Sequence, residues 1–110
     1  MFEKFNDIFI EREKIDHETP DWDYAIEKCW KREIEIFCDN IEETIKFLDT
    51  QCTAEEFSWL SEVFEEIAEK TQSKEFINCL FRVAEKYPEE TKKYNILFFI
   101  ETAKNLIIDN

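Results

Sequence analysis

The feature that most constrains the fold of this chain is the absence of glycine. Its 110 residues include no Gly and only two Pro. The common two-residue β-hairpin turns need a positive φ, which Gly adopts most easily. Loops that cradle phosphates also need Gly, because their backbone must come close to the ligand. The missing Gly argues against P-loop and dinucleotide-binding folds, whereas helices can begin and end on Ser, Thr, Asn and Asp.

The composition is typical of amphipathic helices. Apolar residues make up 44% of the chain, aromatic residues 15% and charged residues 37%. A disordered acidic tail would lack the aromatic residues. The length suits one domain with a core of its own, and no linker rich in Gly, Ser or Pro divides it. We expect an all-α fold: a compact bundle of five or six amphipathic helices, with residues 1–110 in a single domain.

Apolar periodicity and capping residues place the helices in the first half. Residues 2–9 carry three Phe at helical spacing, and this pattern fades in the charged stretch that follows. Thr19 and Pro20 are suited to start a second helix. The next apolar stripe runs from residue 26 to residue 48 without a phase break, so one bent helix fits it, and so do two helices separated at Asn40.

Capping residues mark the helices of the second half more clearly. Thr53 with Glu56 has the spacing of a capping box, and we expect one helix from there to about residue 71. Ser73 caps the next helix, Pro88 opens a short helical turn, and Asn95 can cap the last helix.

Negative charge is strong and unevenly spread. The formal net charge is −13, which repels nucleic acid and anionic membranes and favours basic partners. Residues 39–69 contain ten acidic residues and one basic residue, a net of −9 in 31 residues. Solubility alone would also explain an acidic surface, so the function of this charge stays open at this point.

An acidic stripe is predicted on the helix that begins at Thr53, on the side opposite its apolar face. Like charges at this spacing cost a helix roughly 0.2–0.5 kcal/mol per pair, a repulsion that a docked basic surface would relieve. A solvated face without a partner is the alternative. Because the stripe lies away from the predicted core, we expect its charges to be dispensable for folding. The stripe supplies the candidate partner-binding residues Glu55, Glu62, Glu65 and Glu69.

Trp22 is a second candidate for partner binding. It stands between Asp21 and Asp23 at the start of a predicted helix, and tryptophan is enriched at binding hot spots. We therefore add Asp21, Trp22 and Asp23 to the candidate partner-binding residues, with local packing of Trp22 as the alternative. Trp30 lies on the core stripe, and Trp59 lies at the edge of the apolar face of its helix.

The sequence contains no recognisable catalytic or metal-binding motif. The four Cys have irregular spacing without a CxxC pair, and His17 is the only His, so we expect neither a zinc site nor a cofactor. No pair among the 27 acidic residues stands out for acid–base catalysis, and we expect a protein that is not an enzyme. The start of the chain lacks the apolar core of a signal peptide, which favours the cytoplasm and free, buried thiols.

The stretch CTAEEFSWLSEVFEEIAEKTQSKEFINCLFRVAEKYPEET, residues 52–91, resembles small helical immunity proteins of bacterial polymorphic-toxin and contact-dependent growth inhibition systems. The flanking NIEETIKFL and KYNI are similar to the same family, so that the resemblance covers about the last two-thirds of the chain. It consists of core and capping residues, without a catalytic signature and without a motif that fixes contact residues.

The resemblance implies an inhibitor that binds the toxin domain of a cognate effector and protects the cell that produces it. Many such toxins are nucleases or other enzymes with a basic cleft, which an acidic helical protein can occupy. We expect a toxin protein with a basic surface as the partner, with neither nucleic acid nor membrane bound. A helical adaptor or regulatory interaction domain is the alternative, and the oligomeric state is left open.

Overall fold

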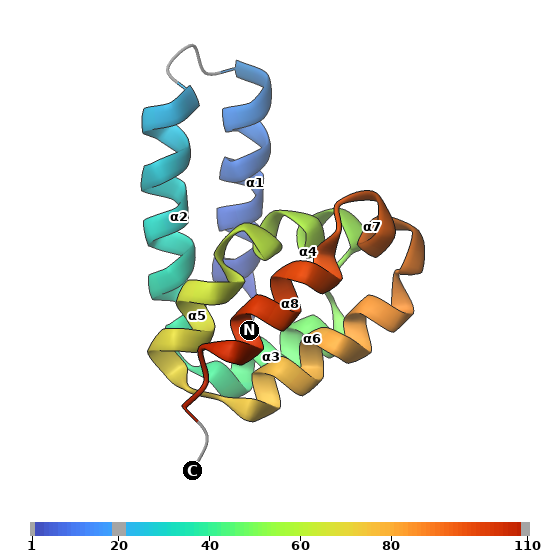
Figure 1. Cartoon of the computed structure of the whole chain (residues 1–110). Helices are drawn as coiled ribbons and strands as arrows, with labels where there is room; N and C mark the ends of the chain where they lie inside the picture. The colour runs from blue at the N-terminus through green and yellow to red at the C-terminus, as the bar shows by residue number, and fades with distance from the viewer. Residues whose placement is uncertain (1, 19–21, 109–110) are drawn as a thin grey trace.

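The structure is a computed structural model, and it describes residues 2–18 and 22–108. It is all-α, as predicted (Figure 1), and the described residues contain no β-strand. The elements in chain order are α1 (Glu3–Glu18), α2 (Trp22–Asp39), α3 (Ile41–Thr50), α4 (Ala54–Leu60), the 3-10 turn η1 (Ser61–Val63), α5 (Phe64–Thr71), α6 (Lys74–Lys86), α7 (Pro88–Lys93) and α8 (Ile96–Asn105). The described residues form more helices than the five or six expected. Residues 26–48 belong to two helices, α2 and α3, and residues 53–71 also form two, α4 and α5.

Side-chain caps explain several helix starts. The Asn40 side chain accepts a hydrogen bond from the Glu43 amide at 3.2 Å, so the stripe 26–48 forms two helices, α2 and α3. Thr53 and Glu56 form the predicted capping box, with the two reciprocal hydrogen bonds at 3.1 and 3.0 Å. Ser73 caps α6 as predicted. These bonds satisfy backbone amides that the first helical turn leaves without a partner.

Helix α1 extends further than its apolar pattern predicts. The pattern fades after residue 10, but the helix continues to Glu18, with Arg12 and Ile15 both buried. Neither the apolar periodicity nor the capping residues predict that the Arg12 side chain is buried. The predicted helix start at Thr19 and Pro20, and the candidate residue Asp21, lie outside the described residues.

The helix predicted from Thr53 to residue 71 is the main error in the secondary structure. The chain instead forms α4, the 3-10 turn η1 and α5 in succession. The Ser61 hydroxyl donates a hydrogen bond to the carbonyl of Ser58 at 2.5 Å, and Val63 leaves the helical region with φ −124° and ψ 14°. A 3-10 turn has three residues per turn, so side chains before and after it no longer follow one straight stripe.

Left-handed backbone occurs without glycine. Among the described residues, the positive φ values belong to Gln72, 55°, which ends α5, and to Asn95, 54°, which precedes α8. Asn95 occupies the predicted N-cap position of α8, but its side chain makes no capping hydrogen bond, which corrects that prediction. Asn tolerates the left-handed region better than most residues, because its side chain can hydrogen-bond locally.

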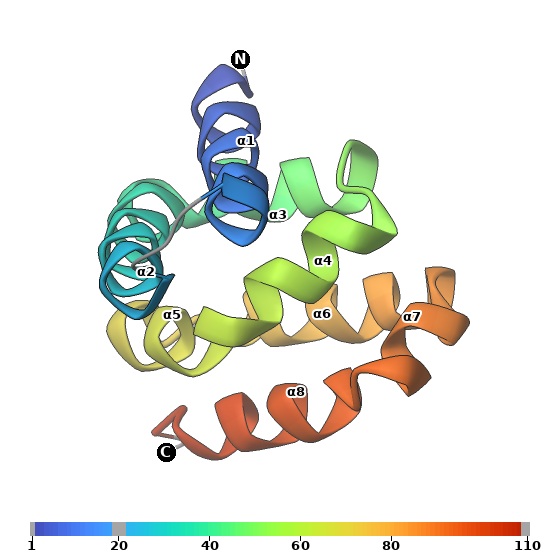
Figure 2. The ribbon, with the colours of Figure 1, turned by 90° about the horizontal axis from the view of Figure 1, so that it is seen from above.

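The helices pack around one aromatic core. Helices α1 and α2 form an antiparallel hairpin, and the rest of the chain packs at its base, with α6 beside α8 and α3 against α6 (Figures 1 and 2). The ring of Phe5 lies 4.7 Å from that of Phe37 and 4.9 Å from that of Phe47, where α1, α2 and α3 meet. The radius of gyration is 13.3 Å, close to the ~13 Å expected for a compact chain of this length. No described helix has the length and apolarity needed to cross a lipid bilayer.

Candidate protein-interaction surface

A buried arginine links the helical hairpin to the rest of the molecule. Arg12 of α1 is only 4% exposed. Its Nε and Nη2 each donate to one oxygen of the Glu62 carboxylate at 2.9 Å, and its Nη1 donates to Asp16 at 2.5 Å. Burial opposes the charge on the guanidinium, but the hydrogen bonds to Glu62 and Asp16 outweigh it and raise the pKa of Arg12. The pair with Glu62 therefore joins α1 to η1 as a charged contact.

This contact changes the interpretation of Glu62. Its side chain is 27% exposed, and its Oε1 also accepts a hydrogen bond from Trp30 Nε1 at 3.2 Å. Arg12 balances the charge of Glu62 within the molecule. We therefore expect Glu62, unlike the other members of the predicted stripe, to contribute to folding, while its role in partner binding stays a prediction.

Trp22 is tied to the same network. Its indole Nε1 donates to Asp16 Oδ1 at 3.0 Å, while the residue remains 39% exposed. Burial of Asp16 opposes its ionisation, but hydrogen bonds from Trp22 and Arg12 lower the pKa of Asp16 overall. The structure thus gives Trp22 a local hydrogen bond and leaves the residue partly exposed, so its role in partner binding stays a prediction. Asp23, next to it, is exposed.

A groove between α1 and α4 gathers acidic and apolar side chains. This α1–α4 groove has a volume of about 360 Å³ and is lined by Asn6, Phe9, Ile10, Glu13, Thr53, Glu55, Glu56 and Trp59. Its charged lining residues are three glutamates, and none is basic. Ile10 is 56% exposed, and the Trp59 ring stacks on that of Phe9 at 6.1 Å. The Arg12 guanidinium lies 6.0 Å from the same Trp59 ring, so the groove adjoins the buried network.

The residues of the predicted stripe have different surroundings in the structure. Glu55 lines the same groove as Glu13 of α1, whereas Glu62 bonds to Arg12. On α5, Glu65 is half-buried and Glu69 is exposed. Sequence analysis missed Glu13 and Ile10 in the groove. The sequence signal for this surface was Ile10, because it follows the two core residues Ile8 and Phe9 and one helix face cannot bury three consecutive side chains.

Sequence analysis also missed a buried carboxylate. Glu33 of α2 is fully buried, its Oε1 lies 3.9 Å from the Cys29 Sγ, and its Oε2 has no hydrogen-bond partner. Burial raises the pKa of Glu33 to about 8, helped by the neighbouring charge of Glu62. The sequence pattern that could have predicted this burial is the position of Glu33 on the core face of α2, four residues from both Cys29 and Phe37.

The four cysteines carry free thiols, and all but the half-buried Cys38 are buried. Burial raises the pKa of Cys29 and of Cys79 to about 12 and also raises that of Cys52. Thiols in this state are protonated at neutral pH and make poor nucleophiles or metal ligands. No group of His, Cys, Asp or Glu among the described residues is arranged to hold a metal ion.

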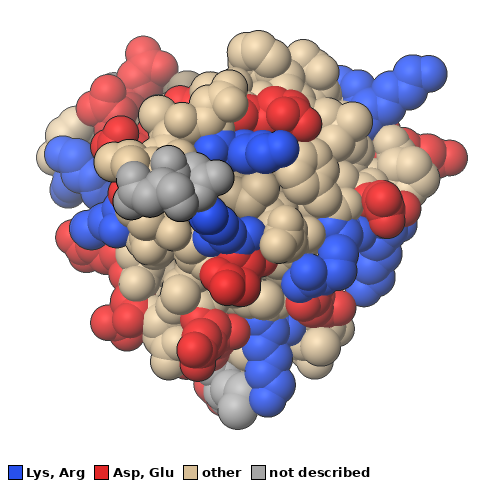
Figure 3. Space-filling model, turned by 60° about the horizontal axis from the view of Figure 1, so that its bottom comes forward, with Lys and Arg blue, Asp and Glu red and all other residues tan. Residues whose placement is uncertain are grey.

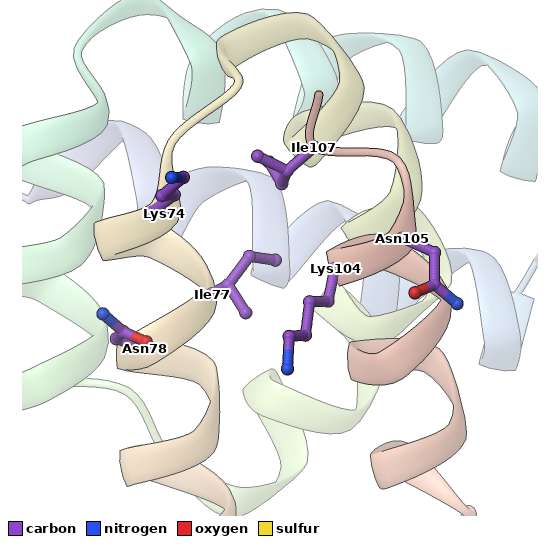
Figure 4. Close-up of a pocket in the computed structure, with 6 residues that line it drawn as sticks. All are labelled: Lys74, Ile77, Asn78, Lys104, Asn105 and Ile107. Carbon is purple, nitrogen blue, oxygen red and sulfur yellow. The ribbon is translucent and has the colours of Figure 1, made fainter. Parts of the chain in front are cut away.

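A second hollow, between α6 and α8, has the opposite charge character. Its volume is about 380 Å³, and Ile77 and Lys104 reach into the space between the helices (Figure 4). The lining contains two lysines and no carboxylate: Lys74, Ile77, Asn78, Lys104, Asn105 and Ile107. The face of the molecule in Figure 3, by contrast, carries both acidic and basic side chains, which are interspersed. Acidic charge without basic counterparts is therefore a property of the α1–α4 groove and not of every hollow.

Comparison with known proteins adds no relative: no protein family, curated protein or solved structure shows significant similarity to this chain.

Proposed function

We propose that this protein is an immunity protein that binds and neutralises a cognate bacterial toxin domain. The observation that supports this function best is the α1–α4 groove, whose lining combines Glu13, Glu55 and Glu56 with the exposed Ile10 and the half-buried Trp59. The resemblance of residues 52–91 to helical immunity proteins points to the same function. The toxin is a nuclease or another enzyme with a basic surface.

The charge of the groove selects the partner. Acidic or nucleic-acid partners are repelled by three carboxylates that lack a basic neighbour in the lining. A lysine or arginine of the toxin is attracted, and long-range attraction between opposite charges speeds the encounter and rejects unsuitable partners. Blocking the basic residues that would hold the phosphates of a nucleic acid inhibits a nuclease directly.

Apolar contacts then hold the complex together. Ile10 can enter an apolar pocket of the toxin, and the Trp59 ring offers a surface for an arginine side chain. Buried aromatic and aliphatic anchors contribute most of the binding free energy in such interfaces, surrounded by polar contacts that exclude water. Among the three glutamates, Glu56 already caps α4, so Glu13 and Glu55 are the charges to be tested.

A helical adaptor is the second candidate function. It is favoured by a separate apolar surface outside the groove, because Tyr94, between α7 and α8, is 47% exposed, and Leu97 and Phe98 of α8 are 50% and 58% exposed. A scaffold that links two partners needs two such surfaces, whereas an inhibitor of one enzyme needs one.

Co-expression distinguishes the two functions. The chain is expressed with the toxin domain encoded immediately upstream of it, and growth is followed for the wild type and two double variants. Glu13→Lys/Glu55→Lys reverses charge in the groove, while the matched control Glu27→Lys/Glu75→Lys reverses two exposed charges on α2 and α6. We expect rescue by the wild type and the control but not by the groove variant.

Two other results count against the proposal. If the upstream domain is toxic and the wild-type chain does not restore growth, neutralisation of that toxin is excluded and the adaptor function takes first place. If the groove variant rescues as well as the wild type, the chain is an immunity protein but the α1–α4 groove is not its contact surface.

A further inference from the structure

We propose that the outer face of α7 and α8 binds a second copy of this chain. This goes beyond toxin neutralisation and does not depend on it, because the face uses none of the residues of the α1–α4 groove.

Helix α8 begins with more apolar residues than the core can accept. Residues 96–100 read ILFFI, and one face of a helix can bury only some of five consecutive side chains. Ile96 and Ile100 are fully buried, but Leu97 and Phe98 are 50% and 58% exposed, and Tyr94 just before the helix is 47% exposed. Exposure of neighbouring apolar side chains to water is unfavourable, and apolar patches of this kind commonly mark surfaces that bind another molecule.

The local charge indicates what covers this face. Residues 88–105, which span α7 and α8, contain three acidic and three basic residues, so their net charge is zero in a chain whose total is −13. A basic partner is drawn to other parts of the molecule, where the negative charge lies. Two copies of the chain repel each other at their acidic surfaces, so this neutral face is where they can approach.

The shape of this face is self-complementary. A hollow of about 460 Å³ has the exposed Leu97 in its lining, together with the apolar Phe81, Ala84 and Pro88 and the polar Glu85, Thr91, Lys92 and Asn95. Each copy thus presents both an exposed ring, Phe98, and a hollow with an apolar part. In a two-fold dimer the same contact occurs twice, with Phe98 of each copy facing the hollow of the other.

Sedimentation equilibrium of the full chain tests this inference. We expect reversible dimerisation between micromolar and millimolar concentrations, because three exposed side chains make an interface smaller than the ~800 Å² per partner of a standard complex. Replacing an interface anchor commonly weakens binding about tenfold. Each copy in a two-fold dimer contributes one Phe98, so Phe98→Gln removes two anchors and should raise the dissociation constant about a hundredfold. Leu97→Gln should act in the same direction.

The matched control is Ile10→Gln, which replaces an equally exposed apolar residue, 56%, in the α1–α4 groove. It should leave the dimer unchanged, and circular dichroism should show full helicity for every variant. Added salt should strengthen the dimer by screening the repulsion between two acidic molecules, whereas toxin binding should weaken. A chain that remains monomeric at millimolar concentration, or a dimer that Phe98→Gln leaves intact, would overturn the proposal. Growth rescue by the Phe98→Gln chain is measured separately, so failure of the dimer and failure of immunity remain distinguishable.

Discussion

Arg12 illustrates how a single residue connects distant parts of the chain. It lies 50 positions from Glu62, yet the two side chains form a pair of parallel hydrogen bonds at 2.9 Å. A partly buried pair of this kind contributes little net stability over an apolar pair, because both charges lose water. Removing one partner is costly, however, because the other charge remains buried without compensation.

The substitution Glu62→Gln should therefore destabilise the fold. The amide keeps the size of the side chain but removes the charge that faces Arg12, and we expect the free energy of unfolding to fall by about 2 kcal/mol. Urea titration followed by circular dichroism measures it. Glu66→Gln, at an exposed position of α5, is the control and should change stability by less than about 0.5 kcal/mol. Equal stability of the two variants would show that the Arg12 contact is not significant.

Glu33 should make stability depend on pH. Its pKa is raised from 4.5 to about 8 by burial. As pH rises from about 5 to about 8, the unfolded chain loses this proton while the folded chain keeps it, so the contribution of Glu33 to stability falls across that range and levels off above it. Urea midpoints of the wild type and Glu33→Gln are compared over this range. The variant should gain stability relative to the wild type as pH rises, and a constant difference would contradict the raised pKa.

At the scale of the element, helix ends are where sequence and structure agree best. Asn40, Thr53 and Ser73 each form the capping bond that their residue type and spacing indicate. The interior of the predicted helix after Thr53 is where they disagree, because neither capping residues nor apolar periodicity indicates the 3-10 turn at Ser61–Val63. The residues of the predicted acidic stripe also differ in their surroundings, because Glu55 lines the α1–α4 groove and Glu62 pairs with Arg12.

The substitution Thr53→Ala tests the value of the capping box. It removes the hydroxyl that accepts the Glu56 amide, and the loss should be about 1 kcal/mol in the free energy of unfolding. Thr50→Ala is a matched control. Thr50 is also exposed, but its hydroxyl bonds to the Lys46 carbonyl within α3, where alanine is a better helix former. Thermal unfolding should show a clear loss for the first variant only, and similar losses for both would argue against the cap.

At the scale of the whole molecule, the net charge of −13 is distributed unequally. Residues 39–69 have a net charge of −9, while the acidic and basic residues of α7 and α8 cancel to a net charge of zero. The acidic part provides the groove for the proposed toxin contact, and the neutral part provides the proposed contact between copies. The same charge also opposes compaction, because like charges repel one another more strongly in the folded chain.

Salt should therefore raise the thermal stability of the protein. Screening reduces the repulsion among exposed carboxylates at moderate ionic strength, and we expect the melting temperature to rise by several degrees between low and physiological salt. Differential scanning calorimetry measures the rise. Glu66→Lys/Glu69→Lys, which replaces two exposed acidic residues and reduces the net negative charge by four, should show a smaller rise. A melting temperature that does not respond to salt would mean that the charges repel one another too weakly to matter.

The sequence by itself determined the fold class and the starts of most helices. These properties depend on neighbours within about four positions along the chain: the missing Gly, the capping residues and the apolar periodicity. Glu55 and Trp22, predicted from the sequence as partner-binding residues, are exposed in the structure. The tertiary structure alone decided that Glu62 pairs with Arg12 and that Glu13 lines the same groove as Glu55. The reason is physical. Periodicity along the chain determines which face of a helix is buried, but the charged residues that come into contact with that face are determined by the packing of helices far apart in the sequence.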